Sequence, residues 1–557
     1  MRIRRPSLHL SILLVTVILS LSVFGSPEIH FTVGFDEQVM RHRFTPFNIQ
    51  LSGLSEPIEA ALLVRQTRGI PGATQAEVVH TVEQGMLSNG SYEATLPLYE
   101  PLNPVTVELV HANGERLASA QISARLGIRE WPFPIIVGDP LRVDQTEAIV
   151  DVSELPSDWW AYDIAKSVWL LEPIASAPIL ETLGEWVVSG GSLVLFTGAE
   201  FPKMDSPVFR KLLPIGSPTL SQRGDGIYVL NGDRKLAASN ILMGEELPLL
   251  VQMPLGAGQI SLVTVRYEDL SDDEFAEIVD QIDSATRMPG IEQLTVATLR
   301  STSVPRPPYW ITPMLTALIL AGLFLFSELS QRLHPKRTLT VLLLVILSSA
   351  VSSGLYANQN NAFVLLYQAR TSLRVVSSFG INADLLTLYA TQPLALIVDH
   401  SEASAPISSA MSTTYSADFS EVDNAEGSAL QLQANERRDL TLFDRGRLGI
   451  EMAFVTEGIE ITNRLGTELG DCYVLFGQDT YAVPVLSTGT HIYPLQPAYL
   501  PGETTSRMRA LEAWFPLRDS GVWLLNVSEE DGSTFEEKGV HKKVRHVTIQ
   551  LVEGVSP

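Results

Sequence analysis

Two carboxylates follow apolar runs that are typical of buried strands. Glu172 follows the run 167–171 (SVWLL), and Glu200 lies shortly after the run 192–196 (SLVLF). Ligands of open α/β sheets bind at the carboxyl ends of the strands, so these positions are where a site would form. The candidate ligand-binding residues are Glu172, Thr197, Gly198 and Glu200.

Two interpretations of these acids are open. A pair of carboxyl groups that flanks a sugar bond performs glycoside hydrolysis, which would make Glu172 and Glu200 an acid and its partner. Alternatively, both are solvated loop acids without a chemical role. We prefer the second interpretation.

Groups for nucleophilic catalysis are missing from this part of the chain. The single cysteine, Cys472, lies far beyond it, and no histidine occurs between His111 and His334. A thiolate nucleophile and a histidine base are therefore unavailable there. The chain also lacks H-E-x-x-H, G-x-S-x-G, Walker A and EF-hand motifs. We expect no catalytic residue, no cofactor and no metal site.

Three weaker features have ordinary structural interpretations. Cys472 lies in an alternating strand pattern, which predicts an inert buried thiol. Gly256 and Gly258 match half of a dinucleotide fingerprint, but a plain turn explains them better. The odd spacing of His541 and His546 puts them on opposite faces of a strand, which argues against joint metal binding.

An α/β pattern between residues 130 and 285 would position the carboxylates. Short apolar runs at 134–138 (PIIVG) and 148–152 (AIVDV) resemble the two runs described above. Fully apolar runs of this length are typical of strands that are buried on both faces of a parallel sheet. Residues 254–265 predict a turn that leads into one more strand.

Helices are predicted between these strands. Residues 177–189 carry an apolar stripe at helical spacing, and Gly190 follows where a left-handed cap is expected. Ser271 and Glu274 form a capping-box pattern that opens a helix to about residue 284. Alternating strands and helices predict βαβ units.

This region resembles the class I glutamine amidotransferase-like domain of bacterial membrane-anchored proteins. The resemblance is carried by YDIAKSVWLLEP, LETLGEWVVSGGSLVLFTG and PLGAGQISLVTV, which include Trp186, Val187, Gly190, Gly191 and Leu193. Enzymes of that class place a cysteine just after such a strand and pair it with His and Glu. This chain has FTGAE there. The resemblance therefore implies the fold without the activity.

β modules are predicted on both sides of this domain. Residues 28–127 alternate apolar and polar side chains in short runs separated by Gly, Pro and Asn-Gly turns, which predicts an immunoglobulin-like β-sandwich. Residues 357–557 show similar runs and predict a second β-rich domain outside the cytoplasm.

Apolar sequences predict a membrane topology. Residues 1–25 have a basic start and an apolar run, which indicates a signal peptide or an uncleaved anchor. Residues 309–327 and 338–356 lack charge within their apolar runs and predict a two-helix transmembrane hairpin. The basic loop 328–337 between them would be cytoplasmic. Residues 286–308 form a linker.

Composition limits the function. The 557-residue chain has a formal net charge of −24, which disfavours nucleic-acid binding. Our hypothesis is a non-catalytic scaffold or binding module of the bacterial inner membrane, with a protein or polymer partner. A role as an accessory to transport or envelope assembly would fit it. The alternative is a hydrolase or carbohydrate-active enzyme that uses the strand-end carboxylates.

Overall fold

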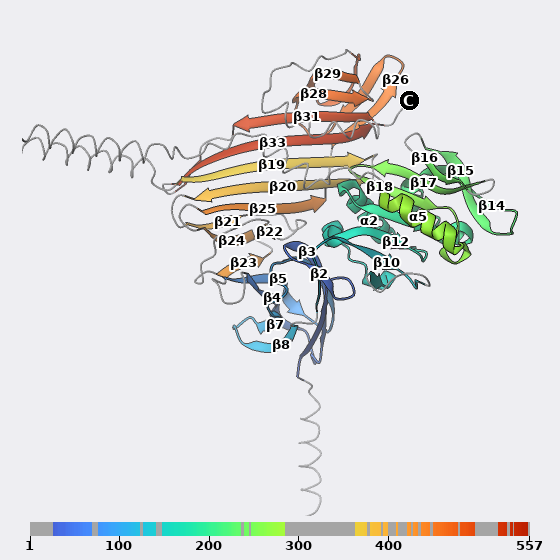
Figure 1. Ribbon diagram of the computed structural model, residues 1–557. Helices are drawn as coiled ribbons and strands as arrows, with labels where there is room; N and C mark the ends of the chain where they lie inside the picture. Colours follow the sequence, from blue (N-terminus) through green and yellow to red (C-terminus); the bar gives the residue numbers. More distant parts are fainter. Residues whose placement is uncertain are drawn as a thin grey trace, which may run out of the picture.

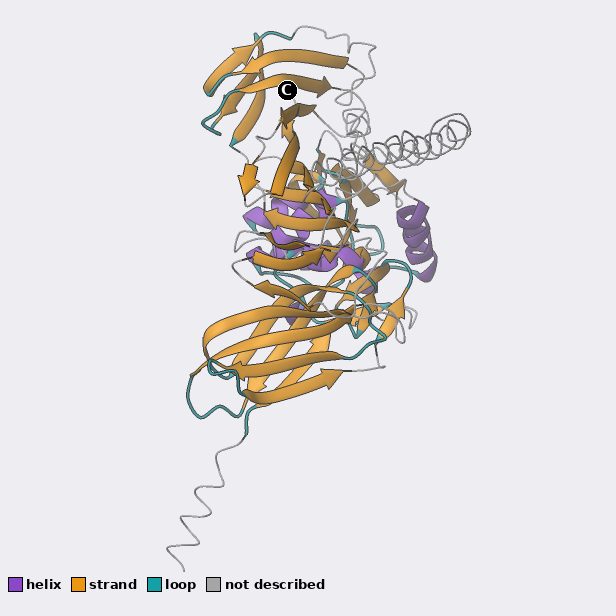
Figure 2. Ribbon diagram, turned by 90° about the vertical axis from the view of Figure 1, so that its left-hand side faces the viewer, coloured by secondary structure: helices purple, strands orange, loops and turns teal. Residues whose placement is uncertain are grey.

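The computed structural model is built mostly of strands, with few helices (Figures 1 and 2). The described residues are 26–68, 76–122, 126–140, 147–235, 239–243, 247–284, 363–375, 379–390, 394–398, 408–409, 420–424, 427–432, 436–445, 449–476, 479–495, 522–531, 535–537 and 540–554. They form an N-terminal β module, a domain with a mainly parallel sheet, and a large C-terminal sheet.

Two antiparallel sheets form the N-terminal module, as the alternating sequence predicts. One has the order β1-β3-β6, and the other contains β5-β4-β7-β8. The strands are β1 (Glu28–Val33), β3 (Arg43–Ser52), β4 (Ile58–Arg68), β5 (Ala76–Leu87), β6 (Gly90–Leu98), β7 (Val105–His111) and β8 (Arg116–Ile122). Inward side chains such as Val33, Ile49 and Leu62 form a shared buried cluster. Short strands β2 (Gln38–Met40) and β9 (Gly127–Arg129) pair with each other beside it.

A seven-stranded sheet with the order β11-β10-β12-β13-β18-β17-β16 forms the second domain. Its first five strands are parallel, and β17 and β16 are antiparallel. The strands are β10 (Phe133–Val137), β11 (Ala148–Val150), β12 (Ala165–Leu170), β13 (Ser192–Phe196), β16 (Ser239–Met243), β17 (Pro248–Leu255) and β18 (Gly258–Val263). Ile135 and Leu193 enter one buried cluster, and Ile136 and Val194 enter another. Burial on both faces explains the continuous apolar runs.

Two helices cover the two faces of this sheet, and both confirm helices predicted from the sequence. α2 (Ala177–Ser189) ends at Gly190, whose φ of 126° suits glycine. α5 (Asp272–Ser284) begins at a capping box, because the Ser271 amide donates to the Glu274 carboxylate at 2.9 Å. The Glu274 amide donates back to Ser271 Oγ at 3.2 Å. Shorter elements nearby are α3 (Phe201–Met204), α4 (Pro207–Leu212), β14 (Ile215–Gln222) and β15 (Tyr228–Arg234).

The C-terminal strands form a nine-stranded sheet that packs on α2 (Figure 1). Its members are β19 (Phe363–Val375), β20 (Phe379–Ala390), β22 (Ser408–Ser409), β25 (Glu436–Arg445), β28 (Leu469–Phe476), β29 (Asp479–Leu486), β31 (Val522–Asp531), β32 (Phe535–Glu537) and β33 (Val540–Gly554). Phe379 and Ile381 of β20 join the same buried cluster as Leu183 of α2. A three-stranded sheet of β26 (Ile450–Val455), β27 (Gly458–Asn463) and β30 (Gly489–Tyr493) lies at its end.

Part of the C-terminal region also extends the N-terminal module. β21 (Leu394–Val398), β24 (Gly427–Leu432) and β23 (Ser420–Asn424) form an antiparallel set, and β23 pairs in parallel with β5. Figure 1 shows these strands beside β5 and β4. Strands from the N-terminal module and from the C-terminal region therefore share one continuous sheet.

Aromatic side chains fill the junction between the three bodies. Phe443 of β25 lies 4.8 Å from Trp159 and 5.4 Å from Phe44, measured between ring centroids. Tyr162 lies 5.5 Å from Phe35 and 5.7 Å from Trp186. Each contact joins side chains from separate elements, and all of these rings are buried. Aromatic burial of this extent contributes strongly to the relative placement of the bodies.

The predicted fold class is corrected by this arrangement. The molecule is mostly β, and its C-terminal strands pair with β5 and pack on α2. Sequence patterns describe single elements well, but they do not report pairing between strands that are hundreds of residues apart.

The membrane prediction is also corrected. Among the described residues, no helix is long and apolar enough to cross a membrane. α2 and α5 have 13 residues each, and such a helix spans about 20 Å, against ~30 Å for a hydrocarbon core. This finding overturns the predicted transmembrane hairpin, the integral membrane partner and the inner-membrane location. Residues 1–25, 286–308, 309–327, 328–337 and 338–356 lie outside the described residues.

Packing of α2 against β20 can be tested at Gly184. A methyl group added there would overlap the ring of Phe379. The Gly184→Ala substitution gains about 1 kcal/mol of helix propensity, but overpacking a core costs about 1–3 kcal/mol. We expect a net loss in the free energy of unfolding, measured by chemical denaturation. Gly224→Ala is the control, because nothing lies within 4 Å of its added methyl group. Equal stability of both variants would contradict the packing.

Candidate functional site

The predicted candidate Glu172 lies where the strand order of the parallel sheet reverses. β10 connects to β11 on one side, whereas β12 on its other side connects onward to β13. The carboxyl ends of β10 and β12 are therefore the switch point at which open α/β sheets bind ligands. A methyl group added at Gly138, just after β10, would lie 2.6 Å from Glu172 Cγ. Glu172 is exposed at this edge. It is therefore open to a ligand.

The other three candidates take part in the structure itself. Thr197 is wholly buried, and its hydroxyl donates to the Val263 carbonyl at 3.0 Å. Gly198 has a φ of 59°, and a methyl group added there would lie 2.8 Å from the amide nitrogen of Arg266. Glu200 forms an ion pair with Lys203 and lies 4.0 Å from Arg266. Glu200 faces Lys203 and Arg266, whereas Glu172 lies beside Gly138. The two carboxylates therefore have different neighbours and do not form a matched pair.

Arg266 lies beside Gly198 and Glu200 and also takes part in the structure itself. Its guanidinium donates to both carboxylate oxygens of Asp269 at 2.8 Å. The hydrogen bond to Asp269, with smaller contributions from the charges of Asp269, Glu268 and Glu200, raises the pKa of Arg266 above its ordinary value. Arg266 therefore stays charged and holds the loop after β18 beside the end of β13.

The remaining sequence features have structural explanations. Gly258 packs directly on the carbonyls of Val187 and Gly191, and the Ala257 amide donates to Val188 at 2.9 Å. This turn leads into β18, at the edge opposite the strand ends that bind ligands, so it is no dinucleotide site. Cys472 is 1% exposed, as predicted for a buried thiol. Within the described part of the chain, no group of three His, Cys, Asp or Glu side chains is placed to hold a metal ion.

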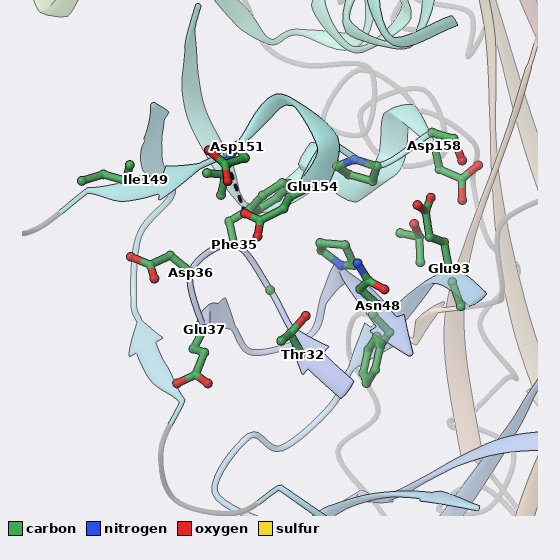
Figure 3. Close-up of a pocket in the computed structure, with 18 residues that line it drawn as sticks. Thr32, Phe35, Asp36, Glu37, Asn48, Glu93, Ile149, Asp151, Glu154 and Asp158 are labelled. Carbon is green, nitrogen blue, oxygen red and sulfur yellow. Dashed lines mark hydrogen bonds between the residues drawn. The ribbon is translucent and has the colours of Figure 1, made fainter. Parts of the chain in front are cut away.

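A cleft between the N-terminal module and the parallel-sheet domain offers a different site (Figure 3). Its volume is about 540 Å³, which is within the usual range for ligand pockets. Of the residues that line it, six are acidic and none is basic. The acidic residues are Asp36, Glu37, Glu93, Asp151, Glu154 and Asp158.

One wall of the cleft is the outer face of the three-stranded sheet. The strand register pairs Thr32 with Asn48, and Asn48 with Glu93. Directly paired residues project from the same face, so these three side chains form a polar row across the sheet. Phe47, one position along, faces the buried core instead. Alternation along the strand therefore places Glu93 in the cleft.

The opposite wall is built from β11, the 3-10 helix η1 (Val152–Glu154) and the loop 155–158, which leads into a second 3-10 helix, η2 (Trp159–Ile164). The Asp151 amide donates to the Glu154 carboxylate at 3.2 Å, which fixes the turn after β11. Tyr162 lies beneath and donates its hydroxyl hydrogen to the Pro156 carbonyl at 3.3 Å. Burial, with a contribution from the charges of Glu93 and Asp158, raises the pKa of Tyr162 far above its ordinary range. The phenol therefore remains neutral.

Polar bridges hold the two walls in register. Gln38 of the N-terminal module donates its amide to the Glu147 carbonyl at 3.2 Å, and its oxygen accepts from Arg129 Nε at 2.8 Å. Arg43 forms an ion pair with Asp163 at 3.1 Å. These bridges, together with the aromatic junction, define the width of the cleft.

Sequence reasoning missed all six cleft acids. They come from two modules separated by more than 50 residues of chain, and no motif joins them. The available signal was the acidic balance of the chain, which is also explained by solubility. Two of these six acids, Asp36 and Glu37, have φ values of 50° and 58°, which a sequence pattern does not reveal.

The structural role of Thr197 gives a test. The Thr197→Val substitution removes a buried hydroxyl donor, while the Val263 carbonyl keeps the Thr197 amide as a donor. We expect the free energy of unfolding to fall by about 1 kcal/mol, measured by denaturant titration. Thr197→Ser, which keeps the hydroxyl, should lose less. Unchanged stability in the valine variant would show that this hydroxyl has no structural role.

Comparisons with known proteins do not identify the chain. No protein-family model matches it, and no curated protein has significant sequence similarity to it.

Proposed function

We propose that the chain is a non-catalytic binding protein, and that its acidic cleft holds a positively charged segment of a partner. The observation that carries this proposal is the cleft of about 540 Å³ that is lined by six carboxylates and by no basic side chain among the described residues. A concave acidic surface lowers the free energy of a bound cation and favours its approach.

The shape of the cleft supports a macromolecular segment over a metal ion. The carboxylates come from both walls and are spread along the cleft (Figure 3). Figure 3 shows Glu93 and Asp158 near each other, apart from Asp36, Asp151 and Glu154. A metal ion needs several ligands that converge on one point. Separated charges suit a ligand with several separated cations, such as a chain with more than one Lys or Arg.

A non-catalytic role is supported at the predicted strand-end site. Thr197 and Gly198 are occupied by internal packing, and Glu200 is engaged by Lys203. The hydrolase alternative needs two carboxylates free to face one substrate. Of the predicted pair only Glu172 is exposed, whereas Glu200 is half-buried and paired with Lys203.

Neutralising cleft acids tests the proposal. We expect the double variant Asp36→Asn and Glu93→Gln to bind fluorescein-labelled octalysine about fivefold to thirtyfold more weakly, because each exposed ion pair contributes ~0.5–1 kcal/mol. Fluorescence anisotropy measures the dissociation constant. Binding to the unmodified chain should also weaken as salt is raised, since mobile ions screen these charges.

The matched control is Glu56→Gln with Glu83→Gln. It changes the net charge equally, but both residues are exposed and lie outside the cleft. It should bind octalysine nearly as well as the unmodified chain. Equal losses in the two double variants would mean that total charge, and not the cleft, attracts the peptide. No binding by the unmodified chain at low salt would refute the proposal.

A further inference from the structure

The free edge of β11 lies in the acidic cleft. β11 is the outermost strand of the parallel sheet, paired with β10 alone among the described strands. Ile149 lines the cleft and its side chain is 42% exposed. Figure 3 shows Ile149 at the opposite end of the cleft from Asp158. A strand edge inside a cleft offers backbone hydrogen bonds to a further strand.

The backbone of Ile149 points away from β10. The Gly138 amide donates to the Val150 carbonyl at 3.2 Å, so Val150 faces β10. In a strand, successive residues direct their amide and carbonyl groups to opposite sides. The groups of Glu147, Ile149 and Asp151 therefore face outward, toward the N-terminal module.

Side chains already satisfy the outward groups on both sides of Ile149. The Glu147 carbonyl accepts from Gln38 Nε2 at 3.2 Å, and the Asp151 amide donates to Glu154 at 3.2 Å. Between them, the amide and carbonyl of Ile149 have no hydrogen bond to any described residue. The open length is thus one residue, which offers one donor and one acceptor to an incoming strand.

We propose that the partner of the cleft is an extended, basic peptide segment that adds as a strand to β11 at Ile149. This inference rests on the proposed function, and it adds the form of the ligand. Two backbone bonds are few, so most of the attraction comes from the surrounding carboxylates, and the backbone bonds fix the register. The charge of the cleft selects lysine- or arginine-rich chains, and the edge selects an extended conformation.

The test uses a labelled octapeptide of alternating lysine and valine, with blocked ends. One further peptide carries N-methyl groups on its valine amides, and another carries them on its lysine amides. Each pattern blocks one edge of the extended chain and leaves the charge unchanged. Strand addition uses a single edge. We therefore expect one methylated peptide to bind at least threefold more weakly than the parent, and the other to bind as the parent does. Equal affinities for all three peptides, or equal losses in both methylated ones, would overturn strand addition.

Variants of the chain give an independent measurement. Ile149→Pro removes the outward amide hydrogen of residue 149 and leaves the hydrogen bonds between β11 and β10 in place. We expect a threefold to tenfold weaker affinity for the alternating peptide, which is the effect of one hydrogen bond. Ile149→Val keeps the amide and should bind as the unmodified chain. Should Ile149→Pro fail to fold, the methylated peptides still decide the question.

Failure of this inference and of the proposed function can be told apart. If octalysine binds but methylation of either edge has the same effect, the acidic cleft binds cations without strand addition. Absence of binding by every basic peptide removes both proposals. Light scattering tests whether a second copy of the chain occupies the cleft instead. A dimer that dissociates when the peptide is added would show this and would overturn the proposed partner.

Discussion

Packing of aromatic rings at the junction of the three bodies is the constraint on which the rest of the structure depends. Phe443 of the C-terminal sheet lies between Trp159 and Phe44, and Tyr162 lies between Phe35 and Trp186. Each ring contributes about 1.5–3 kcal/mol when it is buried. Carboxylates in the cleft repel one another, but in water each pair costs only about 1 kcal/mol at 4 Å. The junction therefore outweighs the repulsion and keeps the acidic walls facing each other.

The same junction links the fold to the proposed function. η2 carries Trp159 and Tyr162 into the core, and the loop that precedes it carries Asp158 to the cleft. β3 contributes Phe44 to the junction and Asn48 to the opposite wall. Each wall is thus an extension of an element that is fixed by buried rings. A site made by rigid elements loses little conformational freedom on binding, which favours affinity.

Much of the local structure could be predicted from the sequence. The helix 177–189 with its cap at Gly190, the capping box of Ser271, and the buried strand 192–196 all depend on neighbouring residues, which periodicity and capping rules report. Pairing of β23 with β5 and packing of Phe379 on Gly184 depend on residues far apart, and no local pattern encodes them. The position of Glu172 after a buried strand follows from neighbouring residues, so the sequence predicts it. The cleft acids are brought together by long-range contacts, so the sequence does not predict their grouping. The membrane interpretation relied on apolar runs and on the basic residues beside them, and no described helix supports it.

Hydrogen–deuterium exchange with and without octalysine tests the central claim most directly, because it reports where on the whole chain the peptide binds. The account predicts slower exchange in the segments that form the two walls, residues 28–50, 91–96 and 147–158, and unchanged exchange around Thr197 and Glu200. Protection confined to the strand ends near Glu172 and Glu200, or spread evenly over the acidic surface, would contradict it.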